Sequence, residues 1–251
     1  MAGLRAEGIR KSFGGVLAVD EVSITVKPGE IVGLIGPNGS GKTTLLNVIA
    51  GVYPPDHGRV SVDDRDITGL PSHRIAREGI ARTFQNIRLF GELNVLENAQ
   101  VGVPAPGRNP RERPRVIAWE TLKRLHLTSR VTQRAVTLPY GPQRGVEIAR
   151  ALAANPQYLL LDEPAAGMNE AESDELLKTV RRFQADLRIG LLVIDHDLRL
   201  IMRLCDRVVV LNEGRVIAEG APSEVQQSPE VVSVYVGTRA TEGRTSRHGT
   251  P

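Results

Sequence analysis

The chain has 251 residues, of which 41% are hydrophobic, enough to fill the core of one large domain. No apolar run approaches the roughly 20 residues that cross a bilayer, and the first residues lack the apolar stretch of a secretory signal, so we expect a cytosolic protein. The net charge is +3, but the basic excess lies in residues 104–115 and 237–251 and only 4% of residues are aromatic, which disfavours a nucleic-acid-binding protein.

In the first half of the chain, apolar and polar residues alternate over residues 22–26, which predicts a strand with one buried face. The short apolar run at residues 31–36 is typical of a buried strand in a parallel sheet. A glycine-rich stretch then leads into a predicted helix over residues 43–52. We expect one more strand within residues 58–67 and a charged helix from Pro71 to Ala81.

Four prolines between residues 104 and 114 exclude a continuous helix there. The second half of the chain then alternates predicted helices with two buried strands that end in polar residues, and it includes a hairpin. These elements are a short helix at residues 119–125, a helix from Val146 to Ala154, a strand at 157–164, an amphipathic helix at 171–187, a strand at 190–197 and a hairpin around Asn212 to Gly214. The last residues, 237–251, are predicted to be disordered. The sequence therefore predicts one α/β core with helical and antiparallel additions, in which Cys205 is a small buried residue.

The segment GPNGSGKT, residues 36–43, matches the phosphate-loop pattern G-x-x-x-x-G-K-[ST] and lies between a predicted buried strand and a predicted helix. Its glycines let the backbone curl so that N–H groups converge on phosphate. Lys42 would reach the β- and γ-phosphate oxygens, and the Thr43 hydroxyl would bind Mg²⁺. The alternative, a glycine-rich turn without a ligand, does not explain why strand, lysine, hydroxyl and helix occur together.

Two adjacent carboxylates, Asp162 and Glu163, end the predicted strand at residues 157–164. Such pairs are common on protein surfaces, but a phosphate loop requires a metal ligand and a group that activates water. We therefore expect Asp162 to bind Mg²⁺ directly or through water, and Glu163 to polarise the attacking water.

Three further residues are candidates that the residue pattern alone leaves open. His196 follows a buried strand at the sheet edge where ligands bind, and it is either a ligand of the γ-phosphate or a loop histidine. Phe13 either stacks on a base or fills the core. Gln85, an amide between charged and apolar residues, has no assigned role on its own pattern.

Five segments in this order, GPNGSGKTT, RTFQ, LPYGPQRGVEIARAL, LLLDEPAAG and LLVIDHD, resemble the ATP-binding subunits of ABC transporters. The resemblance covers residues 4–236, with residues 91–140 within a helical subdomain. It implies a P-loop NTPase core with an antiparallel β subdomain, an ATPase activity coupled to transport, and ATP with Mg²⁺ as cofactors. The finer pattern is most similar to the subunits that energise uptake of branched-chain amino acids, although subunits for urea, amides and lipopolysaccharide export are similar there.

The resemblance also implies roles for individual residues. Phe13 would stack on adenine, Glu163 would activate water, and His196 would sense the γ-phosphate. The ATP-binding set would be Phe13, Gly36, Pro37, Asn38, Gly39, Ser40, Gly41, Lys42, Thr43, Thr44 and Gln85, and the Mg²⁺ set would be Thr43, Gln85 and Asp162. In such subunits a signature loop faces the ATP bound by a second subunit, and here it would present Tyr140, Gly141 and Gln143.

The signature segment departs from the L-S-G-G-Q that is usual in the family. It has Pro139 at the serine, Tyr140 at the first glycine and Pro142 at the glutamine. We expect Gly141 to be the helix N-cap, with Pro142 at the first helical position, where its missing N–H costs nothing. Gly145 replaces a usual arginine, at about 1 kcal/mol relative to alanine within a helix.

The resemblance implies hydrophobic permease subunits as partners, with a solute-binding protein acting indirectly, at the cytoplasmic face of the cell membrane. Asn169 stands where many relatives carry an aspartate that crosses to the second subunit, and together with the altered signature it favours a heterodimer. Residues 104–115 fall in the part that resembles the permease-docking surface, as either a solvated loop or one whose arginines contact anionic lipids. A soluble ABC-type ATPase and a nucleotide-binding module without turnover are the alternatives.

Overall fold

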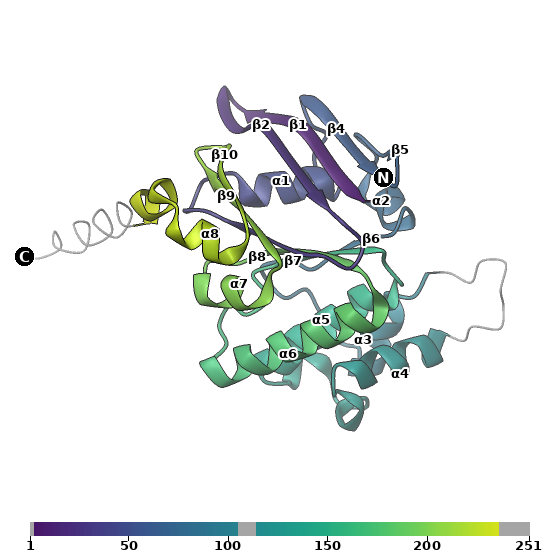
Figure 1. Ribbon diagram of the computed structural model, residues 1–251. Coiled ribbons are helices and arrows are strands. Elements are labelled where there is room, and N and C mark those ends of the chain that lie inside the picture. Colours follow the sequence, from purple (N-terminus) through teal and green to yellow (C-terminus); the bar gives the residue numbers. More distant parts are fainter. Residues whose placement is uncertain (1–2, 105–113, 236–251) are drawn as a thin grey trace, which may run out of the picture.

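The computed structural model describes residues 3–104 and 114–235, which form two sheets flanked by helices (Figure 1). The antiparallel sheet has the strand order β2-β1-β4-β5 among these residues. Its strands are β1 (Leu4–Phe13), β2 (Val16–Val26), β4 (His57–Val62) and β5 (Arg65–Asp66). The strand predicted at residues 22–26 is thus the end of a longer one. The short strand predicted within residues 58–67 is confirmed as β4, but it ends at Val62: Asp63 and Asp64 take left-handed conformations, and β5 follows as a separate strand.

The second sheet of the described residues has the order β10-β9-β3-β8-β7-β6. Its strands are β3 (Ile31–Ile35), β6 (Ile80–Arg82), β7 (Tyr158–Asp162), β8 (Gly190–Ile194), β9 (Arg207–Asn212) and β10 (Arg215–Gly220). All neighbours are parallel except β9 and β10. These two form the hairpin that the sequence predicts, with positive φ at Glu213 and Gly214. The carboxyl ends of the parallel strands therefore meet at one edge, where α/β proteins bind ligands.

Helices cover both faces of the parallel sheet. In chain order they are α1 (Lys42–Ile49), α2 (Ser72–Arg77), α3 (Val95–Val101), α4 (Pro114–Arg124), α5 (Tyr140–Ala153), α6 (Glu170–Leu187), α7 (Leu198–Leu204) and α8 (Pro222–Gln227), with 3₁₀ turns at Thr128–Arg130 and Ala135–Thr137. Helix α1 lies between the two sheets, and α3 to α7 lie on the other side of the parallel sheet (Figure 1).

Side chains of β3 alternate between two hydrophobic clusters, as the pleat of a strand requires. Ile31 and Ile35 pack with the helices α3 to α7, whereas Val32 and Leu34 pack with α1 and the antiparallel sheet. On the helix side, a Cβ at Gly33 would lie 2.8 Å from Ile201 and 2.9 Å from Cys205 Sγ, so a side chain there would push α7 off the sheet. Cys205 is buried, as predicted, and burial raises the pKa of its thiol.

The helix predicted from Pro71 to Ala81 is shorter than expected. Helix α2 ends at Arg77, Gly79 takes a φ of 87°, and Ile80 begins β6 at the sheet edge. The glycine stops the helix, because only glycine takes this conformation at no steric cost. Residues 105–113 and 237–251 lie outside the described residues, so the predictions of a proline-rich loop and a disordered tail, and the division of the chain at residues 91–140, stay predictions.

Candidate functional site

The phosphate loop lies between β3 and α1, as the sequence predicts. Its curl needs glycine at two positions. Gly36 has φ 151° and Gly41 has φ 98°, and a Cβ there would lie 2.1 Å from the Leu211 carbonyl oxygen and 2.3 Å from the Ala18 carbonyl oxygen, respectively. Strands β9 and β2 thus hold the loop so closely that no side chain fits at either end of it.

Lys42 is folded back into the loop. Its Nζ donates to the carbonyl oxygens of Gly36 and Pro37, both at 2.8 Å, and lies 3.4 Å from Ser40 Oγ. Burial lowers its pKa, while the charges of Glu163 and Asp162 act in the opposite direction. Helix α1, which begins here, has no side-chain cap. An anion such as a triphosphate would satisfy both the lysine and the first amides of the helix, so the residues present fit the expected ligand.

Glu163 contacts two other predicted site residues, Gln85 and His196. Its backbone takes a φ of 47°, and its N–H donates to the Ile194 carbonyl oxygen at 2.7 Å, which fixes it beside the end of β8. Gln85 Nε2 donates to Glu163 Oε2 at 3.1 Å, and His196 Nδ1 lies 3.7 Å from the same oxygen. The structure therefore brings Gln85, Glu163 and His196 together at the carboxyl ends of β6, β7 and β8.

His196 is mostly exposed, with 67% of its side chain accessible, and it stands next to buried Asp195. Burial raises the pKa of Asp195, whose Oδ1 accepts the N–H of Asp197 and lies 3.7 Å from His196 Nδ1. An imidazole at the rim of a carboxylate pair can reach outward to a ligand. This geometry favours His196 as a ligand of the γ-phosphate over His196 as a loop histidine without a role.

Asp162 makes a buried ion pair that sequence reasoning missed. Arg82 Nη2 lies 2.9 Å from Asp162 Oδ2, and both side chains are at least nine-tenths buried. Arg82 Nη1 also donates to Asn47 on α1 at 2.5 Å. One guanidinium therefore connects the edge strand β6, the expected metal ligand on β7 and the helix that follows the phosphate loop.

Phe13 is at the end of β1 and is 43% exposed, so its interpretation as a core aromatic is wrong. Its ring meets Tyr53 edge to face, with centroids 5.2 Å apart and an interplanar angle of 74°. Lys11 Nζ lies 5.5 Å from the ring centroid and is itself held 2.7 Å from Asp56. An ordered, exposed ring in this position is available to stack on a base.

Helix α5 begins two residues earlier than the predicted first helical position, Pro142. Its N-cap is Pro139 and its first residue is Tyr140, so the prediction of Gly141 as the N-cap is wrong. The backbone N–H of Gln143 donates to the Pro139 carbonyl oxygen at 3.1 Å, which closes the first turn. Pro142 thus takes the third helical position. The amide there has no partner within a helix either, so proline still loses no hydrogen bond.

Two departures from the usual family pattern, Gly145 in the signature segment and Asn169 after it, have structural reasons. A Cβ at Gly145 would lie 3.1 Å from Leu127 Cδ1, so glycine lets the chain before the 3₁₀ turn at Thr128 pack closely on α5. Asn169 is the N-cap of α6: its Oδ1 accepts from the Glu172 amide and Glu172 Oε2 accepts from the Asn169 amide, both at 3.0 Å. This reciprocal capping box explains an amide side chain at position 169.

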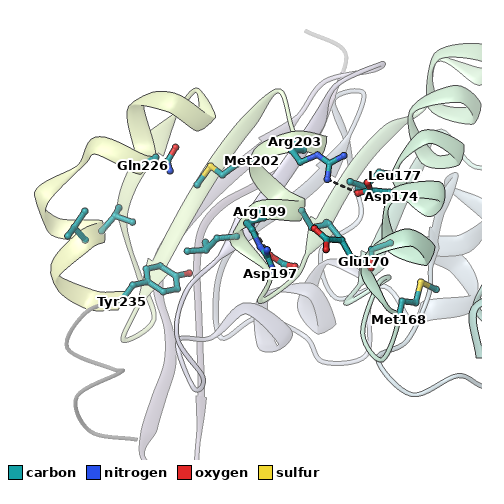
Figure 2. Close-up of a pocket in the computed structure, with 15 residues that line it drawn as sticks. Met168, Glu170, Asp174, Leu177, Asp197, Arg199, Met202, Arg203, Gln226 and Tyr235 are labelled. Atoms are coloured by element: carbon teal, nitrogen blue, oxygen red, sulfur yellow. Dashed lines mark hydrogen bonds and ion pairs between the residues drawn. The ribbon is translucent and has the colours of Figure 1, made fainter. Parts of the chain in front are cut away.

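A cavity of about 670 Å³ lies next to the site, between α6, α7 and the C-terminal helical residues 222–235 (Figure 2). Met168 lies in the loop after β7, Asp197 lies in the loop after β8, and both are at the border of the cavity. Tyr235 closes the other side. Burial raises the pKa of its hydroxyl to about 12, and the backbone of Gly36 acts in the opposite direction. The C-terminal helical segment thus lies near the first residue of the phosphate loop.

No helix in the described part of the chain combines the length and the apolar character that spanning a membrane requires. No group of three or more histidine, cysteine, aspartate or glutamate side chains is arranged there to hold a metal ion by itself. A metal at Asp162 would therefore need ligands of other kinds, and the Thr43 hydroxyl and a bound phosphate are such ligands.

Comparison with known proteins gives consistent matches over nearly the whole chain. The family model described as ABC transporter matches residues 19–166, and the model described as Branched-chain amino acid ATP-binding cassette transporter matches residues 215–241. The high-affinity branched-chain amino acid transport ATP-binding protein BraF of Pseudomonas aeruginosa is 40% identical over 93% of this chain and 97% of its own length. The lipopolysaccharide export system ATP-binding protein LptB of Escherichia coli is 38% identical over 94% of this chain and 98% of its own length.

Solved structures agree with the fold. The ADP conformation of MJ1267, an ATP-binding cassette of an ABC transporter, superposes with a TM-score of 0.86 at 36% identity, over 94% of this chain and 99% of that chain. The dimeric structure of MJ0796, a bacterial ABC transporter cassette, gives a TM-score of 0.77 at 28% identity, over 87% of this chain and 98% of that chain. The expected α/β cassette with an antiparallel sheet is confirmed.

Proposed function

The chain belongs to the ABC transporter family as one of its ATP-hydrolysing subunits, and from this premise we propose that it energises the import of branched-chain amino acids. The observation that supports this solute is the match of residues 215–241 to the C-terminal model of that subgroup, together with the 40% identity to BraF. The likeness to LptB makes lipopolysaccharide export the second candidate.

In this proposal, the phosphate loop and its neighbours bind ATP. Phe13 stacks on adenine, Lys42 exchanges its loop carbonyls for the β- and γ-phosphate oxygens, and the first amides of α1 donate to the phosphates. The residues Thr43, Gln85 and Asp162 would hold Mg²⁺, which neutralises phosphate charge when bound.

Glu163 is the group that accepts a proton from the attacking water. Gln85 keeps its carboxylate oriented through the hydrogen bond at 3.1 Å, and His196, whose Nδ1 lies 3.7 Å from the same oxygen, reaches the γ-phosphate. General bases of this kind contribute about 10²–10⁴-fold to a reaction rate. The signature segment of a second subunit completes the exposed rim of this site. In the same way, Tyr140, Gly141 and Gln143 of this chain face the phosphate loop of the second subunit. The Gln143 side chain is itself engaged within this chain, because it donates to the Leu138 carbonyl oxygen at 2.7 Å.

The permease docks on a groove between α1 and α2 on one side and α3 and α5 on the other. Its lining includes Val52 after α1, Ile75 on α2, Phe84 beside Gln85, Gly102 after α3 and Arg150 on α5. A helix of a hydrophobic permease placed here would contact the Gln85 loop (residues 83–93) directly, so that docking and ATP hydrolysis share a structural element. The chain would then work at the cytoplasmic face of the cell membrane.

A pull-down of the tagged chain from detergent-solubilised host membranes tests the proposal, with mass spectrometry of the retained proteins. We expect multi-span permeases whose operon or sequence relatives transport branched-chain amino acids, and a second ATP-binding subunit. Retention of lipopolysaccharide-export permeases would shift the assignment to that system. Retention of ribosomes or repair proteins, without any permease, would contradict a role in transport.

The oligomeric state is a separate prediction. Each ATP site of the pair would combine the phosphate loop of one subunit with the signature segment of the other. In this chain Pro139 removes the signature hydroxyl and Asn169 is used as a helix cap, so the ATP site that contains this chain's signature is weakened. We therefore expect a non-identical sister subunit to supply the signature of the other ATP site. Native mass spectrometry of the purified transporter checks this. One copy of this chain per complex is the expected result, and two copies without a sister would contradict it.

A further inference from the structure

Arg144 is the largest fully buried side chain among the described residues, and nothing in the proposed reaction uses it. It lies on the second turn of α5, and none of its side chain is accessible to water. Its Nη1 donates to Glu147 Oε2 and to the Phe84 carbonyl oxygen, both at 2.6 Å. Its Nη2 donates to the Gln85 carbonyl oxygen at 2.7 Å and to Tyr140 Oη at 3.2 Å. A buried guanidinium is costly, so its contacts call for an explanation.

The contacts of Arg144 join two segments that are far apart in the sequence. Glu147 adds to the connection, because its Oε1 accepts the Phe84 amide at 3.3 Å. The pair therefore holds the backbone on both sides of the Phe84–Gln85 peptide against α5. Since Arg144 binds backbone atoms, it follows the position of the Gln85 loop rather than the rotamer of one side chain.

At one end of this connection is the catalytic carboxylate. The side chain of Gln85 donates to Glu163, while the carbonyl of the same residue accepts from Arg144. At the other end is the signature segment. Tyr140 accepts from Arg144 and begins α5, and its ring lies against Gly167, where an added Cβ would be 3.3 Å from the ring. A shift of Gln85 is thus passed through a single side chain to the residue that opens the signature helix.

Stability alone does not account for this arrangement. Replacing a buried ion pair with apolar side chains of similar volume is often neutral or stabilising, because desolvation offsets the attraction. The pair is better explained by what it positions.

We propose that Arg144 is a positioning residue that couples ATP bound in this subunit's own phosphate loop to the signature segment that faces the other subunit's ATP. The inference rests on the proposed function, in which Tyr140 and Gly141 serve the second subunit. Binding of ATP moves Gln85, the Phe84–Gln85 backbone moves with it, and Arg144 and Glu147 transfer that movement to the first turn of α5. The signature then reaches its pairing position only when the nearby site is loaded.

The test is amide hydrogen exchange on the full-length chain, with and without Mg²⁺ and the non-hydrolysable analogue AMPPNP. The protein is kept at concentrations where light scattering reports a monomer, so that no second subunit protects the signature. In the wild type, exchange should slow in residues 36–44, which contact the nucleotide, and by about 5-fold or more in residues 140–146, as expected for sites coupled within one protein.

The informative variant replaces both members of the pair, Arg144→Met with Glu147→Met. It leaves no unpaired buried charge, so it should fold with a melting temperature near that of the wild type. We expect residues 36–44 to respond to AMPPNP as in the wild type, while residues 140–146 no longer respond. An equal response of residues 140–146 in this variant, or the absence of that response in the wild type, would overturn the proposal.

Two controls separate coupling from stability and from the proposed function. Arg207 lies on β9, which three strands of the sheet separate from β6, and Arg207→Met breaks its ion pair with Glu30, so it should lower the melting temperature and leave the response of residues 140–146 intact. Loss of that response in Arg207→Met would assign Arg144 a merely structural role. If residues 36–44 of the wild type do not respond to AMPPNP, nucleotide binding itself fails, an outcome distinct from loss of coupling.

Discussion

Glu163 has the geometry of a carboxylate held ready for one task. Its left-handed backbone is uncommon for a residue other than glycine, and the strain is maintained by the hydrogen bond to Ile194 and by the strands on either side. One oxygen already accepts from Gln85. The other is available to a water molecule that approaches from the phosphate loop.

Replacing Glu163 with glutamine therefore removes the base with little change in shape. We expect the turnover number for ATP to fall by about 10²–10⁴-fold while ATP binding is retained, since general-base catalysis is worth that much. Steady-state ATPase assays and equilibrium binding of labelled ATP measure the two effects. Turnover at the wild-type rate in Glu163→Gln would refute the assigned role.

Arg82 supports the neighbouring carboxylate and gives a second prediction. In Arg82→Met, Asp162 is left buried without its cation, so the free energy of unfolding should fall by about 3–5 kcal/mol, the usual cost of breaking a buried pair from one side. Urea unfolding measures the change. The matched control is Arg59→Met, which breaks an exposed pair with Asp66 and should cost less than about 1 kcal/mol. Similar losses in both variants would contradict the special role of Arg82.

Sequence reasoning locates the phosphate loop because its pattern is local: glycine, lysine and hydroxyl follow each other between a strand and a helix. It misses Arg82 and Arg144 for the opposite reason. Each is an arginine in a segment rich in charged residues, and such residues are normally exposed. Their burial depends on Asn47, Asp162 and the Phe84–Gln85 backbone, which are distant in sequence, so no local signal reveals it.

At the scale of elements, the two boundary errors have different origins. Proline and glycine are strong breaks in a helix, so residues 139–142 predict a start of α5 after Tyr140. In the structure Pro139 is the N-cap itself, and the helix accommodates Pro142 in its first turn. The short strand β6 was hidden within a predicted helix, because three residues at a sheet edge carry no periodic signal and are defined only by their pairing with β7.

The position of Pro139 sharpens the expectation for this helix. In Pro139→Ser, a serine at the N-cap would stabilise α5 by about 1 kcal/mol. Loss of the proline would offset this by a similar amount, about 0.4–1 kcal/mol, through the unfolded chain. The free energy of unfolding should therefore change little.

Pairing should respond more strongly than stability in Pro139→Ser. The new hydroxyl can donate to the phosphate bound by the other subunit, and a hydrogen bond to a charged group is worth about 1.5–3 kcal/mol. Nucleotide-driven association of the two ATP-binding subunits, measured by analytical ultracentrifugation with Mg²⁺ and AMPPNP, should tighten accordingly. An unchanged association constant would show that position 139 does not contact the phosphate.

At the scale of the whole molecule, the two hydrophobic clusters on either side of the parallel sheet define two parts. One contains the antiparallel sheet and α1, and the other contains α3 to α7. The groove proposed for the permease has lining residues from both parts. A permease helix that fills it would therefore sense any change in their relative position, which is how ATP binding could be converted into movement of a membrane subunit.

The groove gives a prediction that separates docking from catalysis. Val52 is 45% exposed on the α1 side of the groove and makes no contact with the phosphate loop among the interactions described above. An aspartate there would place an unpaired charge against an apolar permease helix, a contact that costs several-fold in affinity even when partly solvated. Val52→Asp should lose the permeases in the pull-down while the isolated chain hydrolyses ATP at the wild-type rate.

The control for this prediction is Leu187→Asp, at the C-terminal end of α6. It changes an apolar residue of similar exposure outside the groove and should retain the permeases. Retention of the permeases by both variants would place the docking surface elsewhere.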